Sequence, residues 1–344
     1  MDESVLLRDA LQAGRTRSQM RGPGWTPISH GLYVRREADA DLIDRCRHVR
    51  PILPWDAACS HLTAARLWST WLPALPDWLP LQVTIPPGAQ RPERAGLYVA
   101  RSRAALPPPI VVSGVPVLDP ALVIGQLAED LQLIDLVIAI DGFLQQQLCT
   151  EDDTWQAIRS RQRGLPMLRR ALALVDGRSE SRWESVLRLF HVLCKIPVEA
   201  QYPIRDADGE VVARADLRIK ETRRLPEYDG ANHRDRERHR RDLARDKLLA
   251  RSNWERYGYT SVEILDNPTQ ILRDAENALG LRHDRTRLEP WLTEVERSSL
   301  SQLGYRRLLR RLHRFAKPLR GRGERRLRAA AECGKVDPDK GVSA

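Results

Sequence analysis

The sequence predicts a multidomain α/β protein of the α+β kind, and three observations lead to this expectation. The chain has 344 residues, more than one ordinary hydrophobic core accommodates. Hydrophobic residues make up 42% of it and charged residues 30%, a balance typical of folded globular proteins. Segments with strand-like alternation of apolar residues occur together with segments of helical periodicity. We expect four regions, which are residues 1–80, 81–175, 176–285 and 286–344.

The N-terminal region has the element order of a winged helix. Residues 4–20 predict two short helices around Gly14, and the alternation in 25–37 predicts a pair of strands. A further helix is expected to open near Ser60. The segments GLYV and SHLTAARLW resemble the winged-helix domain of abortive-infection type IV antitoxins. The resemblance implies a module that binds DNA or a protein partner; Tyr33 and Trp68 are expected to pack its core.

The middle region shows no residues of recognisable chemistry. Residues 81–150 predict short strands followed by two helices, which indicates an α+β linker domain. The segment GVPV at 114–117, followed by a helix that begins with proline, continues the resemblance to the antitoxins.

The charge of the chain points to a polyanionic partner. The formal net charge is +10 and arginine supplies most of the positive charge, which suits bidentate phosphate contacts. The alternative explanation of the high arginine content is a GC-rich genome, which favours arginine codons. The cysteines form no metal-ligand pattern, and no segment is apolar enough to span a bilayer. The acidic N-terminus differs from a secretory signal, so we expect a cytoplasmic protein with no membrane partner.

Candidate chemistry is concentrated in region 176–285. Ser181 and Glu184 have the spacing of a helix capping box, and capping alone would account for Glu184. Two strands are expected around the Asp208-Gly209 turn, with Asp216 on the polar face of the second strand. A surface salt bridge to a neighbouring arginine is the alternative for Asp216.

A third strand is expected to end in the sequence Glu227-Tyr228-Asp229. Its two carboxylates share one face because side chains of a strand alternate, and Gly230 breaks the strand so that His233 can fold back. Neighbouring strands that present Asp216 and Glu227 would offer the oxygen ligands that Mg²⁺ prefers. A nuclease that hydrolyses phosphodiesters needs a site of this kind.

The order of these residues resembles the very-short-patch-repair-like branch of the PD-(D/E)XK restriction-endonuclease-like superfamily. The resemblance covers about residues 176–285 and includes a helix at 234–251, a strand at 259–265 and a helix after Pro268. It implies a mixed sheet flanked by helices, with Mg²⁺ or Mn²⁺ held by Asp216 and Glu227. It also implies that Glu184 orients water or a ligand, and that His233 acts as a base or stabilises the phosphate.

Two departures from the superfamily pattern concern catalysis. Asp229 stands where the wider superfamily has lysine, although the branch often has aspartate there. Pro226 has no backbone N–H, so the strand lacks one donor of the sheet hydrogen bonds directly before Glu227. The strand is also more polar than the hydrophobic run expected of a central strand. A domain that keeps the fold but cuts poorly is therefore an open alternative.

The C-terminal region is strongly basic. Residues 305–315 predict a basic amphipathic helix, and a disordered arm is expected after it. Phosphate binding is the functional interpretation, and a helix lying on a membrane surface is the competing one. The expected nucleic-acid contacts are Arg306, Arg307, Arg310, Arg311 and Arg314.

The sequence therefore favours a Mg²⁺-dependent endonuclease joined to a winged helix, with DNA as the first expected partner. The rival hypothesis is a non-catalytic DNA-binding regulator of the antitoxin type, in which the nuclease-like region only binds nucleic acid or a protein. The substrate, the recognition sequence, the pathway and the oligomeric state do not follow from the sequence.

Overall fold

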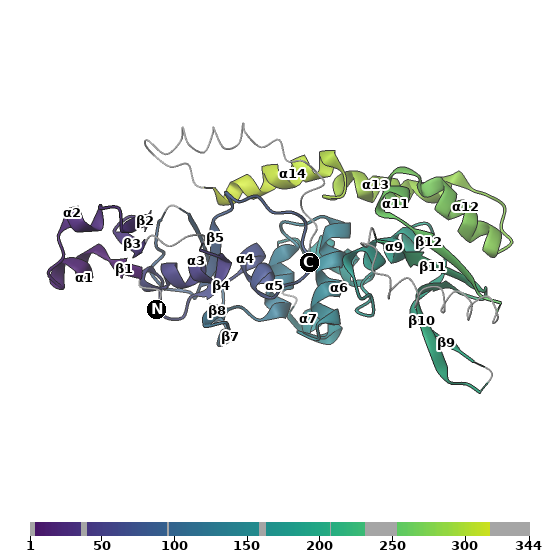
Figure 1. The fold of residues 1–344 in the computed structure, drawn as a ribbon, viewed down its shortest axis with the longest axis horizontal. Coiled ribbons are helices and arrows are strands. Elements are labelled where there is room, and N and C mark those ends of the chain that lie inside the picture. The colour runs from purple at the N-terminus through teal and green to yellow at the C-terminus, as the bar shows by residue number, and fades with distance from the viewer. Residues whose placement is uncertain are drawn as a thin grey trace. The chain divides into compact units, whose positions relative to one another are not determined.

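The computed structural model describes residues 4–35, 40–94, 96–157, 163–206, 208–230 and 253–316. It shows a mixed α/β protein with several small sheets, as the sequence predicts (Figure 1). The chain divides into two compact units, of which unit 1 comprises residues 1–130 and 309–344 and unit 2 comprises residues 131–308. The expected boundaries at 80 and 175 lie inside these units. In the described part, no helix is long and apolar enough to cross a membrane.

Unit 1 begins with the predicted helix pair and strand pair, but residues 4–6, which were expected to be helical, form a third strand that pairs with β3. Its elements are β1 (Ser4–Leu6), α1 (Leu7–Gln12), α2 (Arg17–Met20), β2 (Trp25–Ser29) and β3 (Leu32–Arg35). Gly14 takes φ +83°, which ends α1 without the strain that a side chain would add. Thr16 then caps α2 through a reciprocal bond with Gln19. The three strands form an antiparallel sheet in the order β1-β3-β2.

The rest of unit 1 is built on a five-stranded sheet in the order β6-β5-β4-β8-β7. The strands are β4 (Ala58–Cys59), β5 (Leu81–Ile85), β6 (Leu97–Arg101), β7 (Ile110–Val112) and β8 (Val115–Val117). The helices are α3 (Leu42–Val49), the 3-10 turn η1 (Arg50–Ile52), α4 (His61–Leu67) and α5 (Pro120–Leu127). All five residues of β5 are buried, so this strand lies in the core.

The C-terminal end of the described chain packs into unit 1. The 3-10 turn η3 (His313–Phe315) buries Phe315, whose ring lies 4.6 Å from the Tyr98 ring centroid in an edge-to-face contact. His313 stacks on Trp78 with the ring centroids 4.5 Å apart. Residues 309–316 are thus part of a folded core, and the expected arm after them lies outside the described residues.

Unit 2 combines helices with two strand pairs. Its first helices are α6 (Leu133–Gln145), α7 (Glu151–Ala157), α8 (Leu165–Leu172) and α9 (Arg182–Leu193). Its strands are β9 (Val198–Arg205), β10 (Val211–Ile219), β11 (Arg224–Tyr228) and β12 (Glu255–Tyr259). Next come α11 (Ser261–Asp266), α12 (Pro268–Ala278), η2 (Arg285–Leu288) and α13 (Glu289–Arg297). The last helix, α14 (Gln302–Leu312), passes from unit 2 into unit 1.

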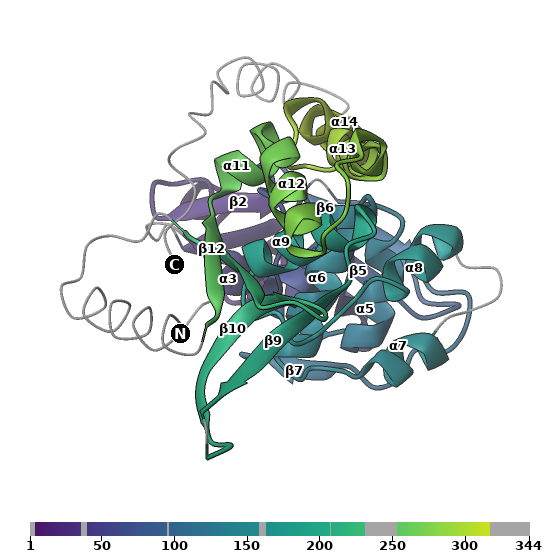
Figure 2. The same ribbon diagram turned by 90° about the vertical axis from the view of Figure 1, so that its right-hand side faces the viewer.

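The strands of unit 2 follow the predicted hairpin and extend it. β9 and β10 are antiparallel, and β11 and β12 are parallel. β11 lies beside β10 (Figure 1), and Leu225 of β11 packs with Ala215 and Ile204 of the hairpin. Figure 2 shows β9 and β10 side by side. A parallel pair needs a crossover connection, which here runs through residues outside the described part.

The strand expected at 259–265 is wrong in position. The structure ends β12 at Tyr259 and begins α11 at Ser261. Thr260 accepts a hydrogen bond from the Glu263 backbone, and the Glu263 carboxylate accepts one from the Thr260 backbone. This capping box stabilises a helix that begins directly after β12, where the resemblance implied a strand.

A buried ion pair fixes helix α9 within unit 2. Asp141 of α6 is fully buried, and its Oδ2 accepts from Nη2 of Arg188 at 2.9 Å and from Oγ of Ser185 at 2.7 Å. Its Oδ1 accepts from the Asp176 backbone at 2.8 Å. Burial raises the pKa of Asp141, and the arginine and hydroxyl donors act against that rise. This network sets where the N-terminal turn of α9, with Glu184, lies.

Candidate functional site

The candidate site in unit 2 is built on the ends of β10 and β11. Along β10 the side chains of Ala215, Leu217 and Ile219 are buried, and Asp216 lies on the other face, as the alternation predicts. Oδ2 of Asp216 accepts a hydrogen bond from the backbone nitrogen of Tyr228 at 2.9 Å. The bond attaches Asp216 to the residue between Glu227 and Asp229. It therefore brings the Asp216 side chain to the end of β11.

Glu227 and Asp229 are held together by an arginine that the sequence analysis did not single out. Nε of Arg256 lies 2.5 Å from Oε2 of Glu227, and Nη2 lies 2.7 Å from Oδ1 of Asp229. Glu227 is only 2% exposed, so its charge depends on a partner inside the protein. Arg256 belongs to β12, where it pairs in register with Leu225.

The backbone of β12 leaves space for the Asp229 carboxylate. Gly258 stands opposite Glu227 in the parallel register, and a Cβ atom at this position would lie 1.7 Å from Oδ2 of Asp229. Any larger residue would push the carboxylate out of its place. The sequence carries no periodic signal for Arg256, because its place beside Glu227 and Asp229 follows from the pairing of β12 with β11.

Glu184 lies on the first turn of α9, as expected. Ser181 caps the helix by accepting from the Glu184 backbone at 3.2 Å, and Oε2 of Glu184 accepts from the Glu180 backbone at 2.8 Å. The same oxygen accepts from Nε2 of Gln201 on β9 at 2.9 Å. Burial, as the largest cause, raises the pKa of Glu184 above its usual range. Ser181 thus caps α9 as expected, but the Glu184 carboxylate bonds the Glu180 backbone instead of the Ser181 backbone that a capping box requires. It also bonds the hairpin.

An aromatic stack joins α9 to the end of β11. The ring of Trp183 lies parallel to that of Tyr228, with a centroid separation of 5.5 Å and an interplanar angle of 12°. The N-terminal turn of α9 therefore lies beside the strand end that carries Glu227 and Asp229. His233, the fifth expected site residue, and the helix expected at 234–251 lie outside the described residues.

The chemistry of these side chains suits a hard divalent cation, because carboxylate oxygens are its preferred ligands. The described residues contain no group of three or more histidine, cysteine, aspartate or glutamate side chains that could hold a metal ion. Arg256 binds Glu227 and Asp229, and Asp216 accepts a hydrogen bond from the Tyr228 backbone. In this conformation the positive charge beside the acids belongs to a guanidinium.

The five arginines of the expected nucleic-acid contact fall into different environments. Arg311 donates to the Asp130 carbonyl at 3.0 Å, and Arg314 forms an ion pair with the buried Asp130 carboxylate at 2.5 Å. Arg307 lies 3.5 Å from Glu296. Arg306 and Arg310 are exposed and have no ion pair among the described residues. These two are therefore the members of the set best placed to meet phosphate.

Comparison with known proteins gives distant similarity only. No family model matches the chain. Two mycobacterial proteins, uncharacterised protein MT2308 and uncharacterised protein Rv2248 of Mycobacterium tuberculosis, are each 26% identical to it over 220 residues. The match covers 61% of this chain and 76% of each relative. The match with the crystal structure of the Rv2827c protein from the same organism covers 54% of this chain and 75% of the Rv2827c chain. Its TM-score is 0.37 and its sequence identity 16%.

Proposed function

We propose that this chain is a cytoplasmic nucleic-acid-binding protein whose unit 2 is a metal-dependent endonuclease of the very-short-patch-repair-like kind. The observation that carries the proposal is the bond from the Tyr228 backbone to Asp216. It brings a strand-borne aspartate to the same strand end as Glu227 and Asp229. Asp216, Glu227 and Asp229 are thereby grouped around the end of β11, with Glu184 on the adjoining helix turn.

Each of these residues would have its own role in phosphodiester hydrolysis. Asp216 and Glu227 would hold Mg²⁺ or Mn²⁺, which supplies a polarised water and offsets charge on the departing oxygen. Glu184, whose pKa is raised by burial, is suited to hold a water by hydrogen bonding. Arg256 keeps the acids from repelling one another before a substrate arrives. Arg306 and Arg310 add positive charge that attracts the phosphate backbone.

A second candidate function is supported by the same arginine. If the ion pairs of Arg256 with Glu227 and Asp229 persist in every state, the acids hold no cation. Unit 2 would then bind nucleic acid or a protein without cutting, as in a regulator of the antitoxin type. The N-terminal helices and strands of unit 1 would supply contacts to DNA or to a partner under either function.

A cleavage assay separates the two functions. Purified protein is incubated with supercoiled plasmid, single-stranded DNA and RNA, each with Mg²⁺, Mn²⁺ or EDTA. The endonuclease proposal requires products that depend on the metal and disappear in the Asp216→Asn variant. Binding to the same nucleic acids without any product under all conditions would favour the regulator.

A further inference from the structure

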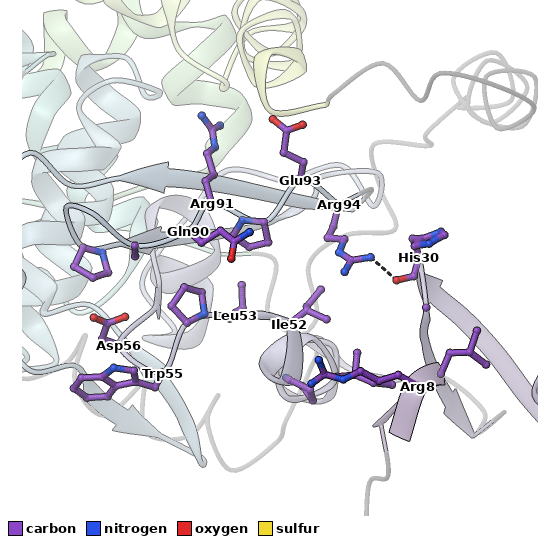
Figure 3. A pocket seen from close by; sticks show the side chains of 18 of the residues that line it. Arg8, His30, Ile52, Leu53, Trp55, Asp56, Gln90, Arg91, Glu93 and Arg94 are labelled. Carbon is purple, nitrogen blue, oxygen red and sulfur yellow. Dashed lines mark hydrogen bonds between the residues drawn. The ribbon is translucent and has the colours of Figure 1, made fainter. Parts of the chain in front are cut away.

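Unit 1 contains a groove of its own, which includes none of the acids just described. It encloses about 1100 Å³ and is lined by three parts of unit 1. The first part is α1 with Arg17 at the start of α2 and the β2–β3 turn. The other two parts are the segment from η1 to Asp56 and the loop between β5 and β6 (Figure 3). Trp55 and Asp56 lie at one end of the view, and Arg8 and His30 lie at the other.

The lining of the groove is cationic. Its charged side chains are those of Arg8, Arg17, Arg91, Arg94, Asp56 and Glu93. The side chains of Arg17 and Arg91 form no hydrogen bond or ion pair with the described residues, so their donors are available to a ligand. Guanidinium groups bind phosphate oxygens in a bidentate way. The groove therefore favours an anionic ligand with more than one charge.

Trp55 presents an aromatic face to solvent. Its side chain is 85% exposed, the largest value among the exposed apolar side chains of the described chain. The turn beneath it is fixed, since Arg50 donates to the Pro54 carbonyl at 2.6 Å and also to the Trp55 carbonyl. The Ala57 backbone closes the turn by donating to the Pro54 carbonyl at 3.1 Å. A wide apolar ring held rigidly in water is typical of a binding surface.

The walls of the groove are held in place without a ligand. Arg94 donates to the His30 carbonyl and so connects the β5–β6 loop to the β2–β3 turn (Figure 3). Arg101 donates to the Ala89 carbonyl at 3.0 Å, which fixes the same loop from its other side. Prolines at 51, 54, 86, 87 and 92 further limit the backbone. Little conformational entropy would be lost on binding.

We propose that this groove binds one unpaired strand of nucleic acid, with a base stacked on Trp55 and phosphates bound by Arg17 and Arg91. A single strand combines regularly spaced anions with planar bases, which matches both features of the lining. Bases inside a duplex are covered by their neighbours and cannot offer a face to a tryptophan. The proposal rests on the proposed function only in taking nucleic acid as the partner. It does not involve Asp216 or any metal.

Binding of a fluorescein-labelled oligothymidylate about 12 nucleotides long tests the groove. The full chain is titrated in EDTA, so that cleavage plays no part. Trp55→Ala should weaken binding roughly tenfold, the loss expected when one base loses its stacking partner, and Trp55→Phe should retain part of it. Trp155→Ala is the matched control, because Trp155 is 44% exposed on α7 in unit 2. A strand without bases should bind wild type and Trp55→Ala equally.

The arginine contribution is measured by salt dependence. Arg17→Gln and Arg91→Gln should each reduce the slope of log affinity against log salt by about 0.7, the value for one phosphate contact on a single strand. Exposed Arg103 lies outside the groove and supplies the control variant Arg103→Gln. Unchanged affinity of Trp55→Ala, equal binding of a blunt duplex, or tighter binding of a polyglutamate peptide would each overturn the proposal. Because no cleavage is involved, an inactive unit 2 would leave these results unaffected.

Discussion

Nε of Arg256 lies 2.5 Å from Oε2 of Glu227, a carboxylate that is 2% exposed. This contact pairs a buried acid with a side chain that remains 29% exposed. It makes Arg256 both a structural partner of β11 and the competitor of any cation for the same acid. The two roles lead to different measurements.

The structural role predicts a loss of stability in Arg256→Gln. Removing one partner of a buried pair leaves the other charge without compensation, which costs about 3–5 kcal/mol for full burial. Because water reaches part of Arg256, we expect about 1–3 kcal/mol. Urea unfolding of Arg256→Gln, Glu227→Gln and the double variant measures the coupling. A double variant whose destabilisation equals the sum of the two single ones would show that the pair contributes nothing.

The competing role predicts a gain in metal binding for the same variant. With Arg256 replaced, the acids keep their charge and lose their internal cation, so Mn²⁺ affinity should rise. Isothermal titration of Mn²⁺ into wild type and Arg256→Gln compares the two. Lower affinity in the variant would mean that Arg256 orders the acids rather than competing for them.

Asp216→Asn separates chemistry from folding. The asparagine keeps an oxygen that can accept from the Tyr228 backbone, but it lacks the charge that holds a divalent cation. Metal-dependent cleavage should therefore fall at least about a hundredfold, while the melting temperature changes little. Asp216→Ala is the control, since it removes the acceptor as well and should lower stability. Equal cleavage by wild type and Asp216→Asn would remove Asp216 from the site.

Much of the scaffold of this site could be predicted from the sequence, because it follows local rules. The alternation in β10 placed Asp216 opposite the buried Ala215 and Leu217. The Ser181 cap placed Glu184 at the start of α9. Arg256 could not be found in this way, since its role depends on the parallel pairing of β12 with β11 across a segment of more than twenty residues. Contacts over such separations have no periodic signal in the chain.

We expect different effects on stability when two different glycines are replaced by alanine. At Gly304 a Cβ atom would lie 1.8 Å from the Ser298 carbonyl oxygen, a backbone atom that cannot turn aside. Gly304→Ala should therefore destabilise unit 2 by about 1–3 kcal/mol through overpacking. At Gly258 the obstacle is the end of the Asp229 side chain, which can rotate away. Gly258→Ala should barely change urea unfolding but should alter Mn²⁺ binding and cleavage. A large loss of stability in Gly258→Ala would show that the Asp229 position is rigid.

Asp130 predicts a pH-dependent stability of unit 1. Burial, opposed by Arg314, raises its pKa from 3.8 to about 7. An acid with a raised pKa in the folded state stabilises the fold below its unfolded pKa and loses this contribution as pH rises through 7. The free energy of unfolding should therefore fall between about pH 4 and 7 by up to about 4 kcal/mol from this group.

The buried histidines change the free energy of unfolding in the opposite direction over the same pH range. Burial lowers the pKa of His61 and of His191 to about 4, so their contribution is lost as pH falls from 6.5 towards 4. The contribution of Asp130 is therefore isolated only by the difference in stability between wild type and Asp130→Asn. We expect the stability of wild type minus that of Asp130→Asn to fall as pH rises from 4 to 7, as followed by urea unfolding. A difference independent of pH would place the pKa of Asp130 near its ordinary value.

The basic residues of the last helix should separate into structural and phosphate-binding ones. Deleting everything after residue 305 would not isolate a basic arm, since it would also remove the buried Leu308, Leu312 and Phe315. Point substitutions avoid this difficulty. Arg306→Gln and Arg310→Gln should reduce the salt slope of duplex DNA binding by about 0.9 each, with unfolding unchanged. Arg314→Gln should instead destabilise unit 1, because it leaves the fully buried Asp130 carboxylate without its ion pair. If Arg314→Gln flattened the salt slope and left urea unfolding unchanged, the Arg314–Asp130 contact would not be a stabilising one.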